Sequence, residues 1–280
     1  MQTEVVAIVK YIVTLLIVCL ASSTFADQPG KAPVPRHPKP GEFTFVRVEY
    51  DSVGGYGESW YNYDGRTWQR WENDYPEAEQ NFVLRMQELT NLVVNPRPIS
   101  LRIADPRIRD YPFIYMCDVG WMDLRKNEVT ALREYLLNGG FLWIDDFWGQ
   151  AEWMNLEMQM DRVFPELHWR DIPKDHAILK SVFDLDECPQ IPAKIFWDQF
   201  GTTFDDPRGH REPVGGIAGV RDLHFKGLFL EDGRLVAVAT HNSDIGDGWE
   251  RESENEAYFH TFSTKAYAIG INIITYALTH

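Results

Sequence analysis

The chain has 280 residues and a formal net charge of −15 at pH 7, and 44% of its residues are hydrophobic. A chain of this size can bury a core large enough to fold without disulfide bridges or a structural metal. The acidic balance argues against nucleic acid and anionic lipid as partners. It favours a neutral or cationic ligand, or simple solubility.

The N-terminal residues are typical of an export signal. Residues 5–26 are almost continuously apolar, and Thr24 and Ala26 place small residues where an export peptidase reads the chain. We therefore predict a signal peptide over residues 1–26 and an exported protein that is periplasmic or secreted. The alternative is that residues 5–26 stay uncleaved and anchor the chain in a membrane, which would be its only membrane contact.

The rest of the chain predicts a linker followed by one domain. Residues 27–41 are rich in proline and cannot form a core, so we expect a flexible linker. After Gly41 the sequence shows no internal repeat and no domain break. Residues 42–280 therefore predict a single domain.

Strand and helix patterns alternate along the first part of this domain. Residues 43–50 alternate apolar and polar and predict a strand, and residues 51–75 form a loop rich in glycine and aromatic residues. Pro76 begins a helix whose apolar stripe includes Phe82 and Met86. Residues 99–103 predict a further strand.

Residues 111–149 predict a strand, a helix and a second strand. Residues 113–117 and 141–144 are wholly apolar, as expected of strands covered on both faces, and a helix with Leu132 and Leu136 on one side joins them. Two buried strands joined by such a helix favour a right-handed parallel crossover. The sequence therefore predicts an α/β fold with a mostly parallel sheet.

The second half predicts an antiparallel addition and a final helix. Residues 152–164 are helical in pattern, and residues 171–220 are rich in loops. Residues 225–230 and 235–240 flank an Asp-Gly turn signal and predict a hairpin. Residues 256–278 predict a closing helix.

Acidic residues follow several of the predicted strands. In parallel sheets, ligands bind beyond the carboxyl ends of the strands, where these side chains fall. Like charges gathered there would repel unless a cation, a shared proton or a ligand hydroxyl intervened. The sequence therefore predicts a ligand site formed by Asp118, Asp145, Asp146, Trp148, Asn242, Asp244 and Asp247.

Residues 242–248 resemble part of a calcium loop but lack its remaining ligands, including the Glu at its end. Asp244 and Asp247 are candidate ligands for a divalent cation, and the alternative is an ordinary turn. No other cofactor is indicated.

Candidate catalytic residues are Asp145 or Asp146 with His176 as a general base. The alternative for His176 is a packed histidine that bonds the backbone. Cys117 lies within a predicted buried strand, so it is expected to act as a small apolar side chain rather than as a nucleophile. A disulfide between Cys117 and Cys188 is allowed but not required.

The chain resembles the bacterial domain of unknown function 4159 family. The resemblance rests on segments at residues 111–115, 124–128, 139–149, 163–167, 175–179 and 233–250, and it covers nearly all of residues 43–280. It implies a three-layer fold similar to class I glutamine amidotransferases (flavodoxin-like) and to trehalose-utilisation-type proteins. It implies no reaction. The nucleophilic Cys that such amidotransferases need is missing from its expected place, because Asp145 and Asp146 stand there.

Two functional hypotheses follow. The first is a non-catalytic domain that binds a small molecule or a cell-envelope protein through the acidic strand ends. The second is a cell-envelope hydrolase of glycan or amide bonds that uses Asp145 or Asp146 with His176, with a cation as an option. The second requires Asp146 and His176 to lie within one water of each other.

Overall fold

The computed structural model describes residues 38–280 except 56, 64 and 205–218. The predicted signal peptide and most of the predicted linker lie outside these residues. Among the helices that the structure describes, none is long and apolar enough to cross a bilayer.

A seven-stranded sheet forms the centre of the fold, in the order β11-β12-β13-β10-β8-β2-β7. Its strands are β2 (Val46–Glu49), β7 (Ile99–Arg102), β8 (Phe113–Cys117), β10 (Phe141–Asp145), β11 (Arg170–Asp171), β12 (His224–Phe229) and β13 (Leu235–His241). β12 runs antiparallel to its two neighbours, β11 and β13, and the five strands from β13 to β7 in this order are parallel to one another. In chain order the parallel strands take the places 2-1-3-4-5, the order of flavodoxin-type doubly wound sheets.

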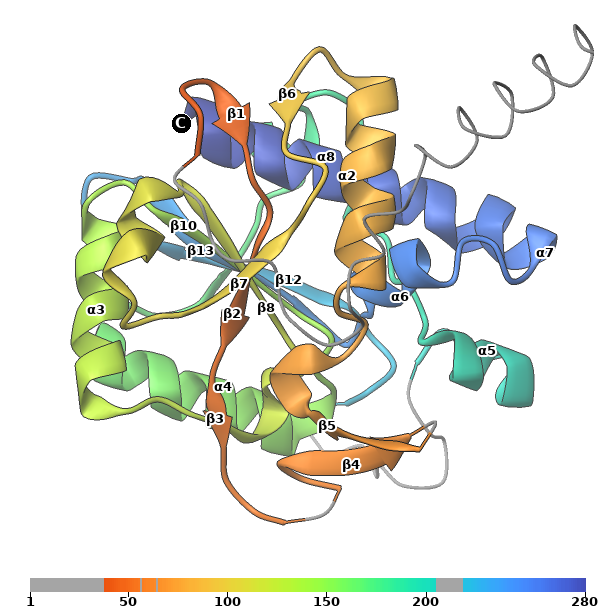
Figure 1. The fold of residues 1–280 in the computed structure, drawn as a ribbon, viewed down its shortest axis with the longest axis horizontal. Helices are drawn as coiled ribbons and strands as arrows, with labels where there is room; N and C mark the ends of the chain where they lie inside the picture. The colour runs from red at the N-terminus through yellow and green to blue at the C-terminus, as the bar shows by residue number, and fades with distance from the viewer. Residues whose placement is uncertain (1–37, 56, 64, 205–218) are drawn as a thin grey trace, which may run out of the picture. The chain divides into compact units, whose positions relative to one another are not determined.

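Helices cover both faces of this sheet (Figure 1). The helices are α2 (Glu77–Leu89), α3 (Lys126–Leu137), α4 (Gly149–Val163), α5 (Lys194–Phe200), α6 (Ile245–Glu250), α7 (Glu256–Tyr258) and α8 (Thr264–Thr279), with a π-helical turn, Phe259–Ser263, between the last two. Along β8, Tyr115 packs on the side of α2, α6 and α8, whereas Ile114 and Met116 pack on the side of α3 and α4. The alternation follows from the two-residue period of a strand.

The predicted mixed α/β fold with a mostly parallel sheet is confirmed. β8 and β10 pair in parallel from Phe113 with Phe141 to Cys117 with Asp145, and β12 and β13 form the predicted antiparallel hairpin. Strands covered on both faces are uninterrupted apolar runs, which is why sequence alone finds them.

Two segments contain elements that were not predicted. The aromatic segment 51–75 contains the hairpin β4 (Trp60–Tyr63) and β5 (Arg66–Gln69), and the loop-rich segment 171–220 contains α5. Both are largely exposed and therefore lack a continuous apolar pattern. Short pairs complete the structure, formed by β1 (Glu42–Phe43) with β6 (Val93–Val94) and by β3 (Asp51–Ser52) with β9 (Met122–Asp123).

A buried ion pair joins the sheet to α2. The Arg47 side chain on β2 is inaccessible to solvent, and its Nε donates to Glu79 Oε1 at 2.6 Å. Its Nη1 donates to the backbone oxygens of Trp71 at 3.1 Å and Asn73 at 2.8 Å. The guanidinium thereby fixes the turn that precedes α2 as well as the helix.

We predict that Arg47→Met destabilises the protein by about 3–5 kcal/mol, because it leaves the Glu79 carboxylate buried without its cation. Arg85→Met, which breaks partly exposed pairs with Glu88 and Glu252, should cost at most about 1 kcal/mol. Urea unfolding measures both changes. Equal losses in the two variants would contradict the assignment of Arg47 as the main electrostatic anchor.

Candidate binding site at the carboxyl ends of the strands

Three neighbouring strands end in the same way. Asp118 follows β8, Asp146 follows β10 and Asn242 follows β13, and all three are left-handed, with φ of 55°, 52° and 62°. Asp and Asn enter this conformation more readily than other residues with side chains. The backbone N–H of Asp118 donates to the Asp145 oxygen and that of Asp146 to the Ser243 oxygen, each at 3.1 Å. These bonds tie the strand ends together.

Asp74 reaches the same edge from the segment between β2 and α2. It too is left-handed, with φ of 62°, and it is 9% exposed. Its Oδ2 is buried and has no hydrogen-bond partner among the described residues. Gly246 lies against it, because a Cβ at position 246 would come within 3.1 Å of Asp74 Oδ2. The glycine thus makes room for an unpaired carboxylate oxygen.

Asp74 belongs to two groups of converging side chains. One group contains Asp244 and Asp247, and the other contains Cys117 and Asp146; in each group the potential ligand atoms lie within 4.8 Å of one another. Asp244 Oδ1 accepts the Asp247 N–H at 2.8 Å as the cap of α6. Asp247 accepts hydrogen bonds from the backbone N–H of Lys194 and, at 3.2 Å, from Arg251 Nε. The carboxylates at 244 and 247 are therefore held in place.

A cavity of about 450 Å³ opens onto the first group. Asp74, Asp244 and Asp247 line it, together with Tyr61 and Tyr63 of β4. Residues of α5 form another wall, including Lys194 and Asp198. β4 and α5, which were not predicted from the sequence, thus form two walls of the cavity.

Asp145 and Asp146 lie close to this cavity but do not line it. Asp145 accepts from the Tyr115 hydroxyl at 2.8 Å, the Gly246 N–H at 3.0 Å and the Thr240 hydroxyl. Asp146 accepts from Asn73 Nδ2 at 2.8 Å and from Trp148 Nε1 at 3.0 Å. Asp145 therefore holds the strand ends together through hydrogen bonds, and Trp148 donates a hydrogen bond to Asp146 from its indole N–H.

Two other predicted ligand residues have structural partners. Asp118 forms an ion pair with Arg70, whose Nη1 lies 2.7 Å from its Oδ2. Asn242 Oδ1 accepts the Gly149 N–H at 2.8 Å, and its Nδ2 donates to the backbone oxygens of Gly219 and Asp222. Arg70 and Arg251 thus lie among the acids and compensate part of their charge.

His176 lies at the other edge of the sheet. Its Nδ1 accepts the Ile178 N–H at 3.2 Å, and its ring packs on Tyr276 and Phe229. Phe229 pairs with Leu235 at the start of β13, whereas the acidic cluster follows the end of that seven-residue strand, about 20 Å away. The predicted approach of His176 to Asp146 is not found, because the loop that follows β11 places the His176 ring against Phe229 and Tyr276, near the amino ends of the parallel strands.

Cys117 is buried behind the cluster, as expected from its strand. Burial raises the pKa of its thiol well above the usual value, and its Sγ donates to Asp146 Oδ2 at 3.6 Å. Cys188 is also buried, and neither cysteine is in a disulfide. A protonated, inaccessible thiol is a poor nucleophile.

Burial and like charge together raise the pKa of the clustered carboxyl groups. Burial is the larger cause of the raised pKa of Asp74, with Glu250 and Asp247 adding to it. The pKa of Asp244 is raised in the same way, by burial and then by Asp146. Without a compensating positive charge, this cluster therefore favours bound protons.

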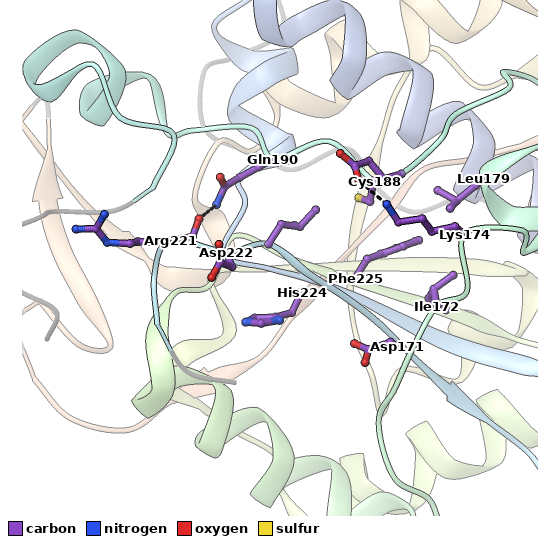
Figure 2. Close-up of a pocket in the computed structure, with 12 residues that line it drawn as sticks. Asp171, Ile172, Lys174, Leu179, Cys188, Gln190, Arg221, Asp222, His224 and Phe225 are labelled. Carbon is purple, nitrogen blue, oxygen red and sulfur yellow. Dashed lines mark hydrogen bonds and ion pairs between the residues drawn. The ribbon is translucent and has the colours of Figure 1, made fainter. Parts of the chain in front are cut away.

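A second pocket, of about 380 Å³, lies beside the antiparallel edge (Figure 2). Several of its charged groups are engaged: Lys174 pairs with Glu187 at 3.0 Å, Asp171 pairs with Lys226 at 2.6 Å, and the Arg221 guanidinium lies over the Phe204 ring. Cys188 lines this pocket with its thiol pKa raised by burial. It contains no convergent group of carboxylates comparable to that around Asp74 among its described lining residues.

A comparison with known protein families gives a match. The profile of the family described as Domain of unknown function (DUF4159) matches residues 44–278, which span the sheet and both helical layers. No curated protein matches the chain.

We predict a pH-dependent difference in stability between the wild type and Asp145→Asn. Burial raises the pKa of Asp145 to about 7. The folded protein thus binds the proton of Asp145 more tightly than the unfolded chain does. The stabilisation that this proton provides is complete below about pH 4 and is lost as the pH rises through about 7. The asparagine cannot ionise. The wild type should thus lose up to about 1.4 kcal/mol per pH unit relative to the variant in this range.

Urea unfolding at several pH values measures this difference. Asp51→Asn is the control with the opposite sign, because hydrogen bonds from Arg125 and Arg102 outweigh partial burial and lower the pKa of Asp51. Parallel pH profiles of the wild type and Asp145→Asn would count against a raised pKa.

Proposed function

The chain belongs to the family described as Domain of unknown function (DUF4159), and we propose that its domain binds a positively charged ligand non-covalently in the acidic cavity. The observation that carries the proposal is the Asp74 carboxylate, which is buried with one oxygen unpartnered on the wall of that cavity. Burying a carboxylate in this way is costly unless a partner compensates it. A cationic group in the cavity would supply that partner.

The charges of the cavity wall support a cationic ligand. The wall contains the carboxylates of Asp74, Asp198, Asp244, Asp247 and Glu254. Among the described residues that line the cavity, the cations of Lys194 and Arg251 alone oppose these acids. A wall with this excess of acids attracts cations and repels anions.

The composition of the wall supports binding without a covalent step through a Ser, Thr or Cys nucleophile. None of the described residues that line the cavity is Ser, Thr or Cys. Cys117 lies behind them as a protonated thiol. The hydrolase hypothesis is less well supported, since His176 lies at the opposite edge and Asp145 is engaged by three hydrogen-bond donors.

The order of the parallel strands and the helices on both faces support a finer likeness of fold. We propose that the domain shares the class I glutamine amidotransferase-like architecture without its nucleophile. We also propose that the chain is exported, because of the apolar segment at residues 5–26. The ligand would then come from outside the cytoplasm, either as a small molecule or as part of a cell-envelope protein.

Thermal unfolding of the full chain with cationic probes tests the proposal. We expect CaCl₂ or spermidine to raise the unfolding midpoint relative to NaCl of equal ionic strength, because a ligand at about 100 times its Kd adds about 2.7 kcal/mol. The Asp244→Asn variant should lose most of this shift. His176→Ala, altered at the opposite edge, should keep it.

The proposal fails if neither probe shifts the midpoint of the wild type. It also fails if both probes shift the wild type and Asp244→Asn equally, since the effect would then lie outside the cavity.

The absence of a reactive thiol is tested separately. We predict that iodoacetamide modifies Cys117 and Cys188 more than about tenfold more slowly in the native chain than in urea, because both thiols are buried and protonated. Mass spectrometry of the peptides measures each position. Rapid native labelling of Cys117 would revive a nucleophilic role.

A further inference from the structure

We infer that Asp74, Asp244 and Asp247 form a binding site for a hard divalent cation such as Ca²⁺. This inference rests on the proposed function, and it names the class of ligand that the cavity takes first. The sequence indicated only Asp244 and Asp247, and the structure adds Asp74 from a segment about 170 residues away. That residue turns a pair on one short helix into a three-sided arrangement.

The spacing of the oxygens fits such an ion. The ligand atoms of the three carboxylates lie within 4.8 Å of one another, and two oxygens bound to one Ca²⁺ at about 2.4 Å are at most about 4.8 Å apart. Carboxylate oxygens are the ligands that hard cations prefer. The cation therefore needs no rearrangement of the backbone to be held by all three side chains.

The three side chains are fixed before any ion arrives. Asp244 is held by the Asp247 N–H, and Asp247 by the Lys194 N–H and Arg251. Asp74 sits on Gly246, and the Arg47 guanidinium binds the preceding residue, Asn73, through its backbone oxygen. Asp74 Oδ2 is left buried and without a hydrogen-bond donor, which is the state expected of an oxygen awaiting a cation.

The cavity completes the site. Three carboxylates satisfy only part of the six to eight oxygen ligands of Ca²⁺. The cavity on the open side is large enough for the remaining positions to be filled by water or by oxygens of a second ligand. A bound cation would thus lie between the three carboxylates and any second ligand in the cavity.

The overlapping group of Asp74, Cys117 and Asp146 is the weaker choice. Cys117 and Asp146 do not line the cavity, so an ion has no described path to them. Asp146 Oδ2 already accepts two hydrogen bonds, from the Cys117 thiol and from Asn73 Nδ2. A soft metal such as Zn²⁺ would have to displace these bonds.

Calcium binding to the chelator-treated full chain tests the inference by equilibrium dialysis with ⁴⁵Ca²⁺. We expect one saturable site per chain in the wild type. Asp74→Asn and Asp244→Asn should each weaken binding at least about tenfold, since even changes to residues around a ligand cost that much. Asp171→Asn, which alters an exposed carboxylate that pairs with Lys226 outside the cavity, should change the Kd less than about twofold.

Asparagine is chosen because it tolerates the left-handed conformation of Asp74. The circular dichroism spectrum shows which variants are folded, and either of the two folded variants decides the outcome.

Absence of saturable Ca²⁺ and Mg²⁺ binding overturns the inference, and so does unchanged binding in a folded Asp74→Asn or Asp244→Asn. Tight Zn²⁺ binding that is lost in Cys117→Ser but kept in Asp244→Asn overturns it as well. If spermidine still raises the unfolding midpoint while neither Ca²⁺ nor Mg²⁺ binds, the inference fails and the proposed function stands. If nothing binds, both fail.

Discussion

The buried guanidinium of Arg47 is the interaction on which the rest of the structure depends. It lies in the central sheet and compensates the charge of the buried Glu79 of α2. It also donates hydrogen bonds to the backbone oxygens of Trp71 and Asn73 in the turn before that helix. A buried charge of this kind requires its partners in place, since each would otherwise be left unpaired in a medium of low polarity. The same side chain therefore joins the core to the residue before Asp74. The core and the candidate site are coupled through one cation.

Much of the fold could be predicted because buried parallel strands are recorded directly in the sequence. The apolar runs at residues 113–117 and 141–144 and the Asp-Gly turn between residues 230 and 235 gave the crossover and the hairpin. The hairpin within residues 51–75 and the helix at residues 194–200 could not be predicted, because most of their residues are at least partly exposed. Periodicity reports burial, and these segments are buried too little to show it.

The candidate site was predicted in part for a related reason. Asp118, Asp145 and Asp146 follow predicted parallel strands, so the topology rule placed them at one edge, where the structure has them. Asp74 and Arg70 come from the long segment between β2 and α2, and no local pattern tells where such a segment returns to the sheet. The contact of Arg251 with Asp247 could have been predicted, since Arg251 follows Asp247 by four residues near the end of the same helix. His176 was misplaced because it lies in a loop after β11, and no local pattern tells at which end of the sheet that loop packs.

The left-handed turns beside the strand ends affect how such a domain could diversify. These turns, or corners, lie at Asp74, Asp118, Asp146 and Asn242. Each corner needs a left-handed residue, and Asp and Asn meet that need equally well while differing by a full charge. Exchange between the two residues alters the electrostatic character of the cleft and leaves the chain path intact. A lineage built on this scaffold could move between binding cations, neutral sugars and anions through a handful of acid-to-amide replacements. Diversity of ligand would then leave hardly any trace in the architecture.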